Sequence, residues 1–561
     1  MQKVLVIVES PAKCKNIEKY LNDESDDVKY IVRACFGHVR DLDKKTLGVD
    51  VERGFRPKYV NIIKKNIKDD LKRYISQVDR VLLATDNDGA GESIAWHLTK
   101  LLQKTKQDKW DRIVFNEITP DAVRNSLQHM RPINMNRVSA QETRRILDRL
   151  MGYTLSPLLW KSIKQKEFCA MSAGRVQSAV LNMIVERERG NTCCTYWSPY
   201  IAYNGYVLNN TSRIHTLEWA QKVVYYISQS LNISTLNDVK PLISEYMVNP
   251  PPALNTCSLQ QKGFELGFDA NTTMKLAQGL FESGHITYIR TESTHVSEQF
   301  VKQANAHIIK TYGTSYVGNV ENTARHEEEA HEAIRPTRLN ACIKDPAASQ
   351  LFDLIKKYAI QSLMSPAIYD NYAMQIDIDG HIFKGCISNL KFGGFMGKES
   401  ESICGDTKIG ALQIGALQIG ALQIEENRNV PFTGSTLIAK LEKQGIGRPS
   451  TYATIIAKLY DRRYIEDFCD RHNALYIDIV HNEPNKKREI TQCIKGIRST
   501  SIGKQVVDVL NQHAPKLMDV EFTKNMEQQL DKIEDGRVMA NDVLSEYWEE
   551  LTRTSAIYGS M

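Results

Sequence analysis

The sequence contains no long apolar segment and few familiar binding signatures. None of its 561 residues lies in a run of about eighteen uninterrupted apolar residues, so no membrane span is expected. Its eleven cysteines include no C-x-x-C pair, which excludes a zinc ribbon. Their odd number favours reduced thiols in an intracellular protein. The G-x-x-x-x-G-K-[ST] loop of many ATP-binding proteins is also missing.

The net charge is small but unevenly distributed. The whole chain carries +5, and residues 137–189 alone hold ten Lys and Arg against five Asp and Glu. A local basic surface on a nearly neutral protein suits a polyanion that must be bound and later released. The length predicts roughly three to five structural units, because one hydrophobic core does not extend over so long a chain.

Carboxylates follow two segments that are expected to form buried strands. Residues 81–85 precede Asp86 and Asp88, and residues 3–8 precede Glu9. Ligands of open α/β sheets bind at the carboxyl ends of the strands, and Mg²⁺ prefers oxygen ligands. The sequence therefore predicts that the three carboxylates converge on one Mg²⁺ ion. For Asp86 and Asp88 alone, a polar turn that caps a helix is the alternative.

The basic segment has the pattern of helices. Residues 136–152 carry an apolar stripe that leaves Arg144, Arg145 and Asp148 on the polar side. Residues 171–178 open another helix, whose N-terminal amides favour an anion and whose small side chains would let a phosphate backbone approach. A solvated helix with ordinary salt bridges is the alternative for any single arginine. The cluster as a whole favours an anion-binding surface.

Tyr288 and Arg290 stand two residues apart in a segment that is expected to be a strand, so both side chains would project from one face. A phenol has a pKa near about 10 and is a poor nucleophile until a positive charge stabilises the phenolate. The polar residues 291–294 indicate an open site. We expect Tyr288 to act as a nucleophile assisted by Arg290, with a core tyrosine as the alternative.

Other segments are less specific. Residues 330–337 contain His331 but not the H-E-x-x-H pattern of a zinc protease, and residues 445–453 supply Arg448 between two expected helices. Residues 196–250 have the pattern of short strands. The sequence IGALQ occurs three times in residues 409–423. Its five-residue period fits neither a helix nor a strand, so we expect a loop without chemistry.

Together these motifs resemble the type IA DNA topoisomerases, in particular those of the bacterial type. Residues 6–13 and 37–42 are similar to the start of the family's Toprim domain, and residues 83–92 are similar to its acidic motif. The remaining matches follow in the family's order: residues 172–178, the segment around Tyr288, residues 330–337 and residues 445–453. They span nearly the entire chain.

The resemblance implies a multidomain α/β and α+β fold in which four domains form a torus. A Toprim α/β domain would span residues 1–118, and the type IA catalytic region would span residues 132–555. That region would contain Arg-rich helical DNA-binding parts (132–195 and 432–555), a β-rich arch (196–255 and 370–431) and the domain of the nucleophilic tyrosine (256–369).

The resemblance also implies a reaction. Tyr288 would attack a phosphodiester of single-stranded or negatively supercoiled DNA, giving a 5′-phosphotyrosine and a free 3′-hydroxyl. One phosphodiester replaces another, so no ATP is required. Arg290 would stabilise charge on the scissile phosphate, and Lys13 and Glu9 would transfer protons to and from the 3′-oxygen. Mg²⁺ at the three carboxylates would align the 3′ end for religation. The protein would be a monomer and bind no membrane.

Matched positions would contact DNA, and two aromatic residues among them would stack on unpaired bases, each stack contributing about 1–3 kcal/mol. Core packing is the alternative for Trp160. The expected DNA-binding residues are His38, Arg144, Arg145, Asp148, Tyr153, Trp160, Ser172, Ala173, Gly174, Arg175, Val176, Gln177, Arg290, His331, Arg448 and Arg462.

Two departures from the family's pattern matter. The chain stops at Met561 without the Cys₄ zinc ribbons that usually follow, so we expect weaker binding and steep salt sensitivity. Where the family commonly reads D-x-D-R-E-G-E, Gly89 and Ala90 stand here. If the lost group supported the metal, affinity would fall roughly 10–100-fold. The alternatives to relaxation of supercoiled DNA are a catalytically weakened single-stranded DNA-binding relative and a decatenase with the same chemistry.

Overall fold

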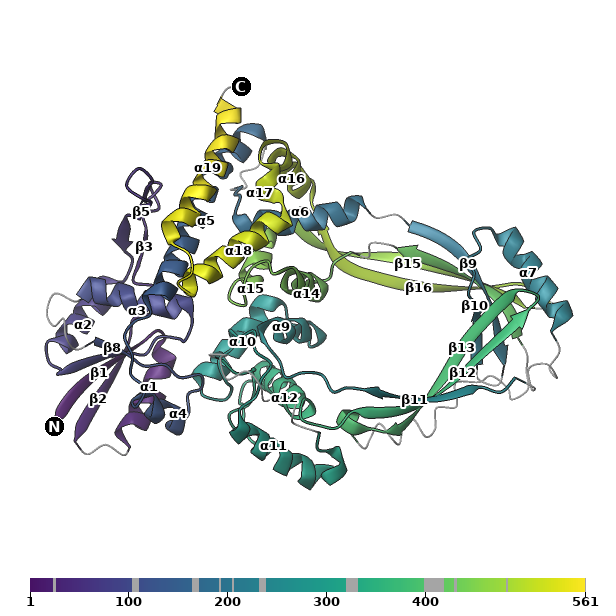
Figure 1. Cartoon of the computed structure of the whole chain (residues 1–561), viewed down its shortest axis with the longest axis horizontal. Coiled ribbons are helices and arrows are strands. Elements are labelled where there is room, and N and C mark those ends of the chain that lie inside the picture. Colours follow the sequence, from purple (N-terminus) through teal and green to yellow (C-terminus); the bar gives the residue numbers. More distant parts are fainter. Residues whose placement is uncertain are drawn as a thin grey trace.

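The computed structural model shows a chain that closes into a ring (Figure 1). It describes residues 1–23, 27–102, 110–163, 171–190, 193–203, 206–231, 239–318, 331–397, 418–427, 431–480 and 483–559. An α/β domain and a helical base occupy one end of the ring in Figure 1, and long strands form an arch at the other end. This arrangement confirms the expected multidomain α/β and α+β torus.

The N-terminal domain is built on a parallel four-stranded sheet in the order β2-β1-β7-β8. Alternate residues of β1 enter separate apolar cores on the two faces of the sheet, which explains the continuous apolar run. The sheet strands are β1 (Gln2–Val8), β2 (Val28–Ala34), β7 (Arg80–Leu83) and β8 (Trp110–Arg112). The domain's other elements are α1 (Pro11–Asn22), α2 (Lys65–Ile75), α3 (Gly89–Leu102), α4 (Pro120–Ser126) and the short strands β3 (Arg40–Leu42), β4 (Val49–Asp50), β5 (Arg56–Pro57) and β6 (Tyr59–Asn61).

The helical base joins two segments that are distant in sequence. Helices α5 (Met135–Ser162) and α6 (Arg175–Arg189) share one apolar core with the C-terminal helices. Those helices are α14 (Gly434–Gln444), α15 (Tyr452–Asp461), α16 (Ser501–His513), α17 (Pro515–Met518), α18 (Val520–Glu534) and α19 (Ala540–Gly559). The helical expectation for residues 432–555 is wrong for β15 (Ile465–Val480) and β16 (Glu483–Ser499), which form an antiparallel pair. The two segments together contain six Ile residues, which favour strands.

A third unit, called the tyrosine unit here, carries Tyr288 and lies against both the base and the N-terminal domain. It contains α9 (Thr256–Glu265), α10 (Ala270–Glu282), α11 (Glu298–Thr311), the 3₁₀ turn η1 (Thr314–Tyr316) and α12 (Pro346–Gln361). The Tyr288 amide donates a hydrogen bond of 2.7 Å to the Asn116 carbonyl. Gly284 has φ +77°, and a Cβ there would lie 2.5 Å from the Ile118 carbonyl oxygen. Only glycine therefore fits at this joint.

The arch is a six-stranded sheet in the order β11-β12-β13-β10-β9-β14. Its elements are β9 (Cys193–Tyr203), β10 (Tyr206–Asn210), α7 (Leu217–Ser230), β11 (Leu242–Val248), β12 (Ala367–Ile378), β13 (His381–Phe392), η3 (Gly394–Met396) and β14 (Gln418–Asn427). The loop expectation for the IGALQ repeat is wrong for its third copy, because residues 419–423 pair with β9 inside β14. An edge strand forms through hydrogen bonds of its backbone amides and carbonyls with the neighbouring strand. The five-residue period of the side chains therefore did not prevent residues 419–423 from forming a strand. Residues 409–417 lie outside the described residues.

Two expectations from composition have different outcomes. Cys14, Cys35, Cys257, Cys342 and Cys386 are free thiols, as expected. Cys469 takes part in a disulfide, so the expectation of reduced thiols fails there. Among the helices in the described ranges, none combines the length and apolar character needed to cross a membrane.

The contact between the tyrosine unit and the base predicts a destabilising substitution. A Cβ at Gly434 of α14 would lie 2.2 Å from Cζ of Phe264 in α9. We expect Gly434→Ala to lower the free energy of unfolding by about 1–3 kcal/mol, because the added methyl overpacks this contact. Thermal and urea denaturation measure the change.

Gly279→Ala is the matched control. Gly279 lies in the exposed interior of α10, and nothing stands within 4 Å of a Cβ placed there. We expect this variant to raise the free energy of unfolding by about 0.5–1 kcal/mol, because alanine is less flexible than glycine in the unfolded chain. Equal effects of the two substitutions would contradict the close packing of α9 on α14.

Candidate active site

The carboxyl ends of β1 and β7 bring Glu9 and Asp86 together, as the sequence predicts. The two strands are parallel neighbours, and the Ala84 amide continues their ladder with a 2.8 Å hydrogen bond to the Ile7 carbonyl. The Asp86 amide then donates to the Glu9 carboxylate at 3.0 Å. The Asp86 carboxylate itself accepts from the buried ammonium of Lys13, at the start of α1.

The loop that carries the aspartates is held from behind by a buried arginine. Arg112 donates to the carbonyl oxygens of Thr85 and Asp86, each at 2.6 Å. A Cβ at Gly91 would lie 2.1 Å from the Asp86 carbonyl oxygen, so this turn requires glycine. Contacts to the backbone of the acidic motif thus fix its conformation in addition to those that its carboxylates make.

Glu92 also matches the acidic motif, but its carboxylate is used internally. It accepts from Arg112 at 3.2 Å, from Arg131 at 2.9 Å and from the Asn134 amide at 2.6 Å. Burial opposes ionisation, yet these donors outweigh it and hold the pKa of Glu92 below its usual value. Glu92 thus joins the N-terminal domain to the start of α5 and is no candidate metal ligand.

Tyr288 and Arg290 meet at one oxygen of Asp88. The Tyr288 hydroxyl donates to Asp88 Oδ2 at 2.6 Å, and Arg290 Nη1 donates to the same atom at 3.0 Å. The second oxygen, Oδ1, accepts from the Gly91 amide at 2.7 Å. The pair of residues thus reaches across the joint between the tyrosine unit and the N-terminal domain.

Two details of the Tyr288 prediction are wrong. Its segment is irregular and follows a single bridge between Ile286 and Pro336, so no strand face orients the side chains. The site is also not open at Tyr288, whose exposed fraction is 2%. The ring packs edge-on against Phe281 with centroids 5.3 Å apart, and the His331 ring lies at 5.5 Å. Closure of the two units over the tyrosine explains both findings.

Burial and neighbouring charges move the pKa values of all three central groups. Burial, with the charges of Asp86 and Asp88, raises the pKa of Glu9 to about 7. Burial opposes ionisation of Asp88, but Arg290 and the Tyr288 hydroxyl outweigh it and lower its pKa. Burial and the Asp88 charge raise the pKa of Tyr288 well above its ordinary value. In this closed state Tyr288 is a neutral phenol.

The donor set fits a hard divalent cation in part. Glu9, Asp86 and Asp88 are close enough for the two aspartates to raise the pKa of Glu9, a repulsion that a cation would relieve. However, no three acidic, histidine or cysteine groups converge at ligand spacing within the described ranges. Lys13 engages Asp86 and Arg290 engages Asp88 instead. Ala90 lines the cavity beside Asp88 and offers no carboxylate.

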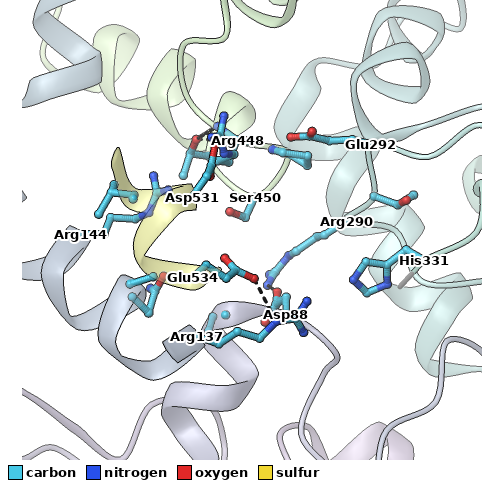
Figure 2. A pocket seen from close by; sticks show the side chains of 18 of the residues that line it. Asp88, Arg137, Arg144, Arg290, Glu292, His331, Arg448, Ser450, Asp531 and Glu534 are labelled. Carbon is cyan, nitrogen blue, oxygen red and sulfur yellow. Dashed lines mark hydrogen bonds and ion pairs between the residues drawn. The ribbon is translucent and has the colours of Figure 1, made fainter. Parts of the chain in front are cut away.

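A central cavity of about 440 Å³ opens at Asp88, between the tyrosine unit, α5 and α18 (Figure 2). Its cations come from separate segments: Arg137 and Arg144 from α5, Arg290 from the tyrosine unit and Arg448 from the turn before α15. Figure 2 shows Arg290 pointing across the cavity toward Asp88, with His331 on the same side. A phosphate in this cavity would meet several guanidinium groups at once.

A basic groove of about 720 Å³ continues from the central cavity. It is lined by Arg144, Arg145, Asp148, residues 172–177, Ser450, Thr451, Thr454, Ile455, Lys458, Asp461 and Arg462. The two hollows share Arg144, Ser450 and Thr451. The structure therefore brings together most of the residues that the sequence assigned to an anion-binding surface, although they lie more than three hundred positions apart.

Comparisons with known proteins agree with this geometry. The family model described as DNA topoisomerase matches residues 132–475 and 482–545, and the Toprim domain model matches residues 4–118. A solved structure of full-length topoisomerase I from Thermotoga maritima is 29% identical, with a TM-score of 0.77. The match covers 98% of this chain and 90% of that one.

The chain belongs to the type IA DNA topoisomerases. It is thus an isomerase that acts on DNA, and its N-terminal domain is of a kind that binds divalent metal ions.

The two aromatic candidates of this topoisomerase lie at the surface. Trp160 is 59% exposed and Tyr153 is 50% exposed, both on α5. The Trp160 indole donates to the Met171 carbonyl at 2.7 Å, which fixes the ring next to residues 172–177. Core packing, the alternative for Trp160, is therefore wrong. His38 lies with Arg145 in a smaller cavity of about 170 Å³, and burial lowers the pKa of its imidazole.

Arg175 occupies a different environment from the one expected. Its side chain is 2% exposed and pairs with Glu527 of α18 and with Asp148. Glu527 also binds Arg144 at 2.8 Å and lies 3.9 Å from Arg448. Arg175 thus positions its neighbours through Glu527, and its guanidinium does not face the groove as an unpaired cation.

Three residues important to the site were missed in the sequence. In the sequence, nothing distinguishes Arg112 and Arg137 from other charged residues near them. In the structure, Arg112 fixes the acidic loop and Arg137 lines the central cavity. Glu527 had no local signal, because its arginine partners precede it by 352 and 383 positions. Only the fold reveals that one helix supplies the counter-charge.

This buried cluster predicts a loss of stability. Burial opposes ionisation of Glu527, but Arg175, Arg144 and Arg448 lower its pKa from 4.5 to about 2. We expect Glu527→Gln to reduce the free energy of unfolding at pH 7 by about 3–5 kcal/mol, because buried arginines lose their counter-charge. Urea denaturation measures the loss, with the exposed Glu521→Gln on the same helix as the control.

The pH dependence has a defined direction. The folded-state pKa lies below the ordinary value, so ionised Glu527 stabilises the protein above pH 4.5 and loses this effect as the pH falls toward about 2. The difference between wild type and variant should shrink over that window. A difference that does not depend on pH would contradict the charge-based role.

Proposed function

We propose that this topoisomerase relaxes negatively supercoiled DNA without ATP, through Mg²⁺-dependent transient cleavage of one strand and a 5′-phosphotyrosine intermediate. The observation that carries the proposal is the meeting of Tyr288 and Arg290 at Asp88, beside a cavity that opens into the basic groove. A nucleophile, a cation for the phosphate and a binding path for a strand are thus joined.

The covalent step exchanges one ester for another. The phenol oxygen of Tyr288 attacks phosphorus, the bond from phosphorus to the 3′-oxygen breaks, and the strand keeps a phosphodiester to the enzyme. Asp88 accepts the hydrogen bond of the phenol and is the acceptor in place for its proton. Arg290 stabilises the negative charge that the equatorial oxygens gain in the transition state. Because no bond energy is lost, religation is the reverse reaction.

The departing 3′-oxygen needs a proton, and two groups beside Asp86 can supply one. Glu9, with a pKa of about 7, holds a proton in a large fraction of molecules near neutral pH. Lys13 is the second donor, held against Asp86 under the Phe281 ring at 5.0 Å. For religation either group takes the proton back. Mg²⁺ bound by Glu9, Asp86 and Asp88 would align the 3′ end electrostatically.

DNA binding and strand passage are assigned to the rest of the ring. The groove residues 172–177, Arg145 and Arg462 hold the strand, and Tyr153 and Trp160 stack on unpaired bases. The tyrosine unit then separates from the base to admit a second strand. This opening must break the contacts of the tyrosine unit with its neighbours; Asn255 of the tyrosine unit, for example, reaches Glu442 of α14 at 3.1 Å.

A plasmid assay tests the function. Negatively supercoiled plasmid with Mg²⁺ and no ATP should be relaxed by the wild type and left unchanged by Tyr288→Phe, which removes the nucleophilic oxygen. Agarose gels measure the topoisomers, and denaturing gels detect the covalent complex. If wild type leaves the plasmid supercoiled across a Mg²⁺ titration but still binds single strands, the binding-relative alternative holds. Linked DNA circles in place of the plasmid test decatenation.

The acidic motif predicts a change in metal demand. Ala90 lines the central cavity next to Asp88, and a carboxylate there would add an oxygen donor. We expect Ala90→Glu to lower the Mg²⁺ concentration that gives half-maximal relaxation by roughly 10-fold. Ala90→Gln, of the same shape but without the charge, is the control. An equal shift in both variants would exclude an electrostatic contribution to metal binding.

A further inference from the structure

A fourth cavity lies beside Asn87, next to Asp88 in the sequence. Its volume is about 470 Å³, and we call it the asparagine pocket. The side chains that matter for its chemistry are Asn87, Phe115, Asn116, Arg131, Asn134 and Arg137. None of the residues that line it is acidic, whereas the central cavity contains Asp88, Glu292, Asp531 and Glu534. The pocket therefore offers amide and guanidinium donors to an anionic ligand, with Arg131 and Arg137 oriented by their pairs with Glu92 and Glu534.

The basic groove, the central cavity and the asparagine pocket adjoin one another. The basic groove and the central cavity share Arg144, and the central cavity and the asparagine pocket share Arg137. Asp88, which binds Tyr288, lines the central cavity, the middle one of the three. A single strand that follows the groove into the central cavity thus has a continuation beyond the scissile phosphate.

The side chains of the pocket are held in fixed positions. Asn87 donates to the Asn116 amide oxygen at 3.1 Å and accepts from Arg137 at 3.3 Å. Asn116 also supplies the carbonyl that binds the Tyr288 amide, so the pocket and the nucleophile are rigidly connected. Arg137 is held by Glu534 at 2.9 Å. Amide groups read the hydrogen-bonding edges of bases, arginine binds phosphate, and an aromatic ring such as Phe115 offers a stacking surface.

Which half of the cleaved strand lies in the pocket follows from how each half is retained. After cleavage the 5′ end stays covalently bound to Tyr288, whereas the segment that ends in the 3′-hydroxyl is held only by non-covalent contacts. The longer and more basic groove suits that upstream segment. We infer that the asparagine pocket binds the nucleotides immediately downstream of the scissile phosphate. This inference rests on the proposed function.

Oligonucleotide binding tests the inference. Two fluorescent single strands share their upstream sequence; one extends four nucleotides beyond the cleavage site, and the other ends at the cleavage site with no nucleotide beyond it. Binding is measured by anisotropy with Tyr288→Phe protein in EDTA, so neither cleavage nor metal contributes. Adding Asn116→Asp should weaken binding of the longer strand about tenfold, because the carboxylate repels phosphate, and change binding of the shorter strand less than twofold.

Matched variants separate the pocket from general effects. Asn125→Asp adds the same charge on the exposed surface of α4 and should leave both affinities unchanged. Phe115→Leu keeps the apolar packing but removes the stacking ring, so it should weaken binding of the longer strand only. It replaces Asn116→Asp in the test if that variant does not fold. If these pocket variants reduced the affinity for both strands equally, or for neither strand, the inference would be overturned. Failure of the proposed function shows separately, as absence of a covalent complex with wild-type protein and Mg²⁺.

Discussion

The Asp88 carboxylate links the tyrosine unit to the N-terminal domain at the nucleophile itself. Asp88 Oδ2 accepts from both the Tyr288 hydroxyl and the Arg290 guanidinium, and it lies at the joint between the tyrosine unit and the N-terminal domain. The same contact keeps the nucleophile buried, neutral and aligned with the acidic loop. The position of Asp88 depends in turn on Arg112, which fixes the loop through carbonyl groups, and on the glycine at position 91. Catalytic geometry and this link between the two units therefore depend on the same few backbone contacts.

Helix α18 supplies carboxylates that pair with the arginines around the central cavity and the basic groove. A surface that binds DNA must collect cations, yet clustered guanidinium groups repel one another when DNA is absent. Glu527, Asp531 and Glu534 follow one face of α18 and pair with arginines of α5, α6 and the turn before α15. Phosphates that enter must compete with these carboxylates, which lowers net affinity and eases release. Because salt weakens these internal pairs as well as the phosphate contacts, the competition by the carboxylates offsets part of the salt dependence of phosphate binding.

The sequence predicted what depends on local pattern. The strands that precede Glu9 and Asp86 and the surface around Arg144 follow from apolar runs and charge, and the helix expected to open in residues 171–178 is present but begins only at Arg175. It did not predict the role of Glu527 or the burial of Arg175, because both depend on partners hundreds of positions away. The strand expected at Tyr288 was wrong for a related reason: contacts with Asn116 and Asp88 orient that segment in place of a sheet. The residues of the motifs could thus be predicted from the sequence, whereas the carboxylates that pair with them could be identified only in the structure.

The energetics of opening favour a definite order of events. In the closed, DNA-free ring, separation of the tyrosine unit would take Arg290 from Asp88 and leave both charges without their partner, which has a cost even for partly buried groups. In the proposed intermediate a phosphate is bound to Tyr288 itself, so Arg290 keeps an anionic partner that moves with its own unit. The phenol no longer donates to Asp88 either, which removes another of the contacts between the two units. Cleavage therefore replaces an inter-unit contact with an intra-unit one, and the ring opens at lower cost after the strand is cut than before.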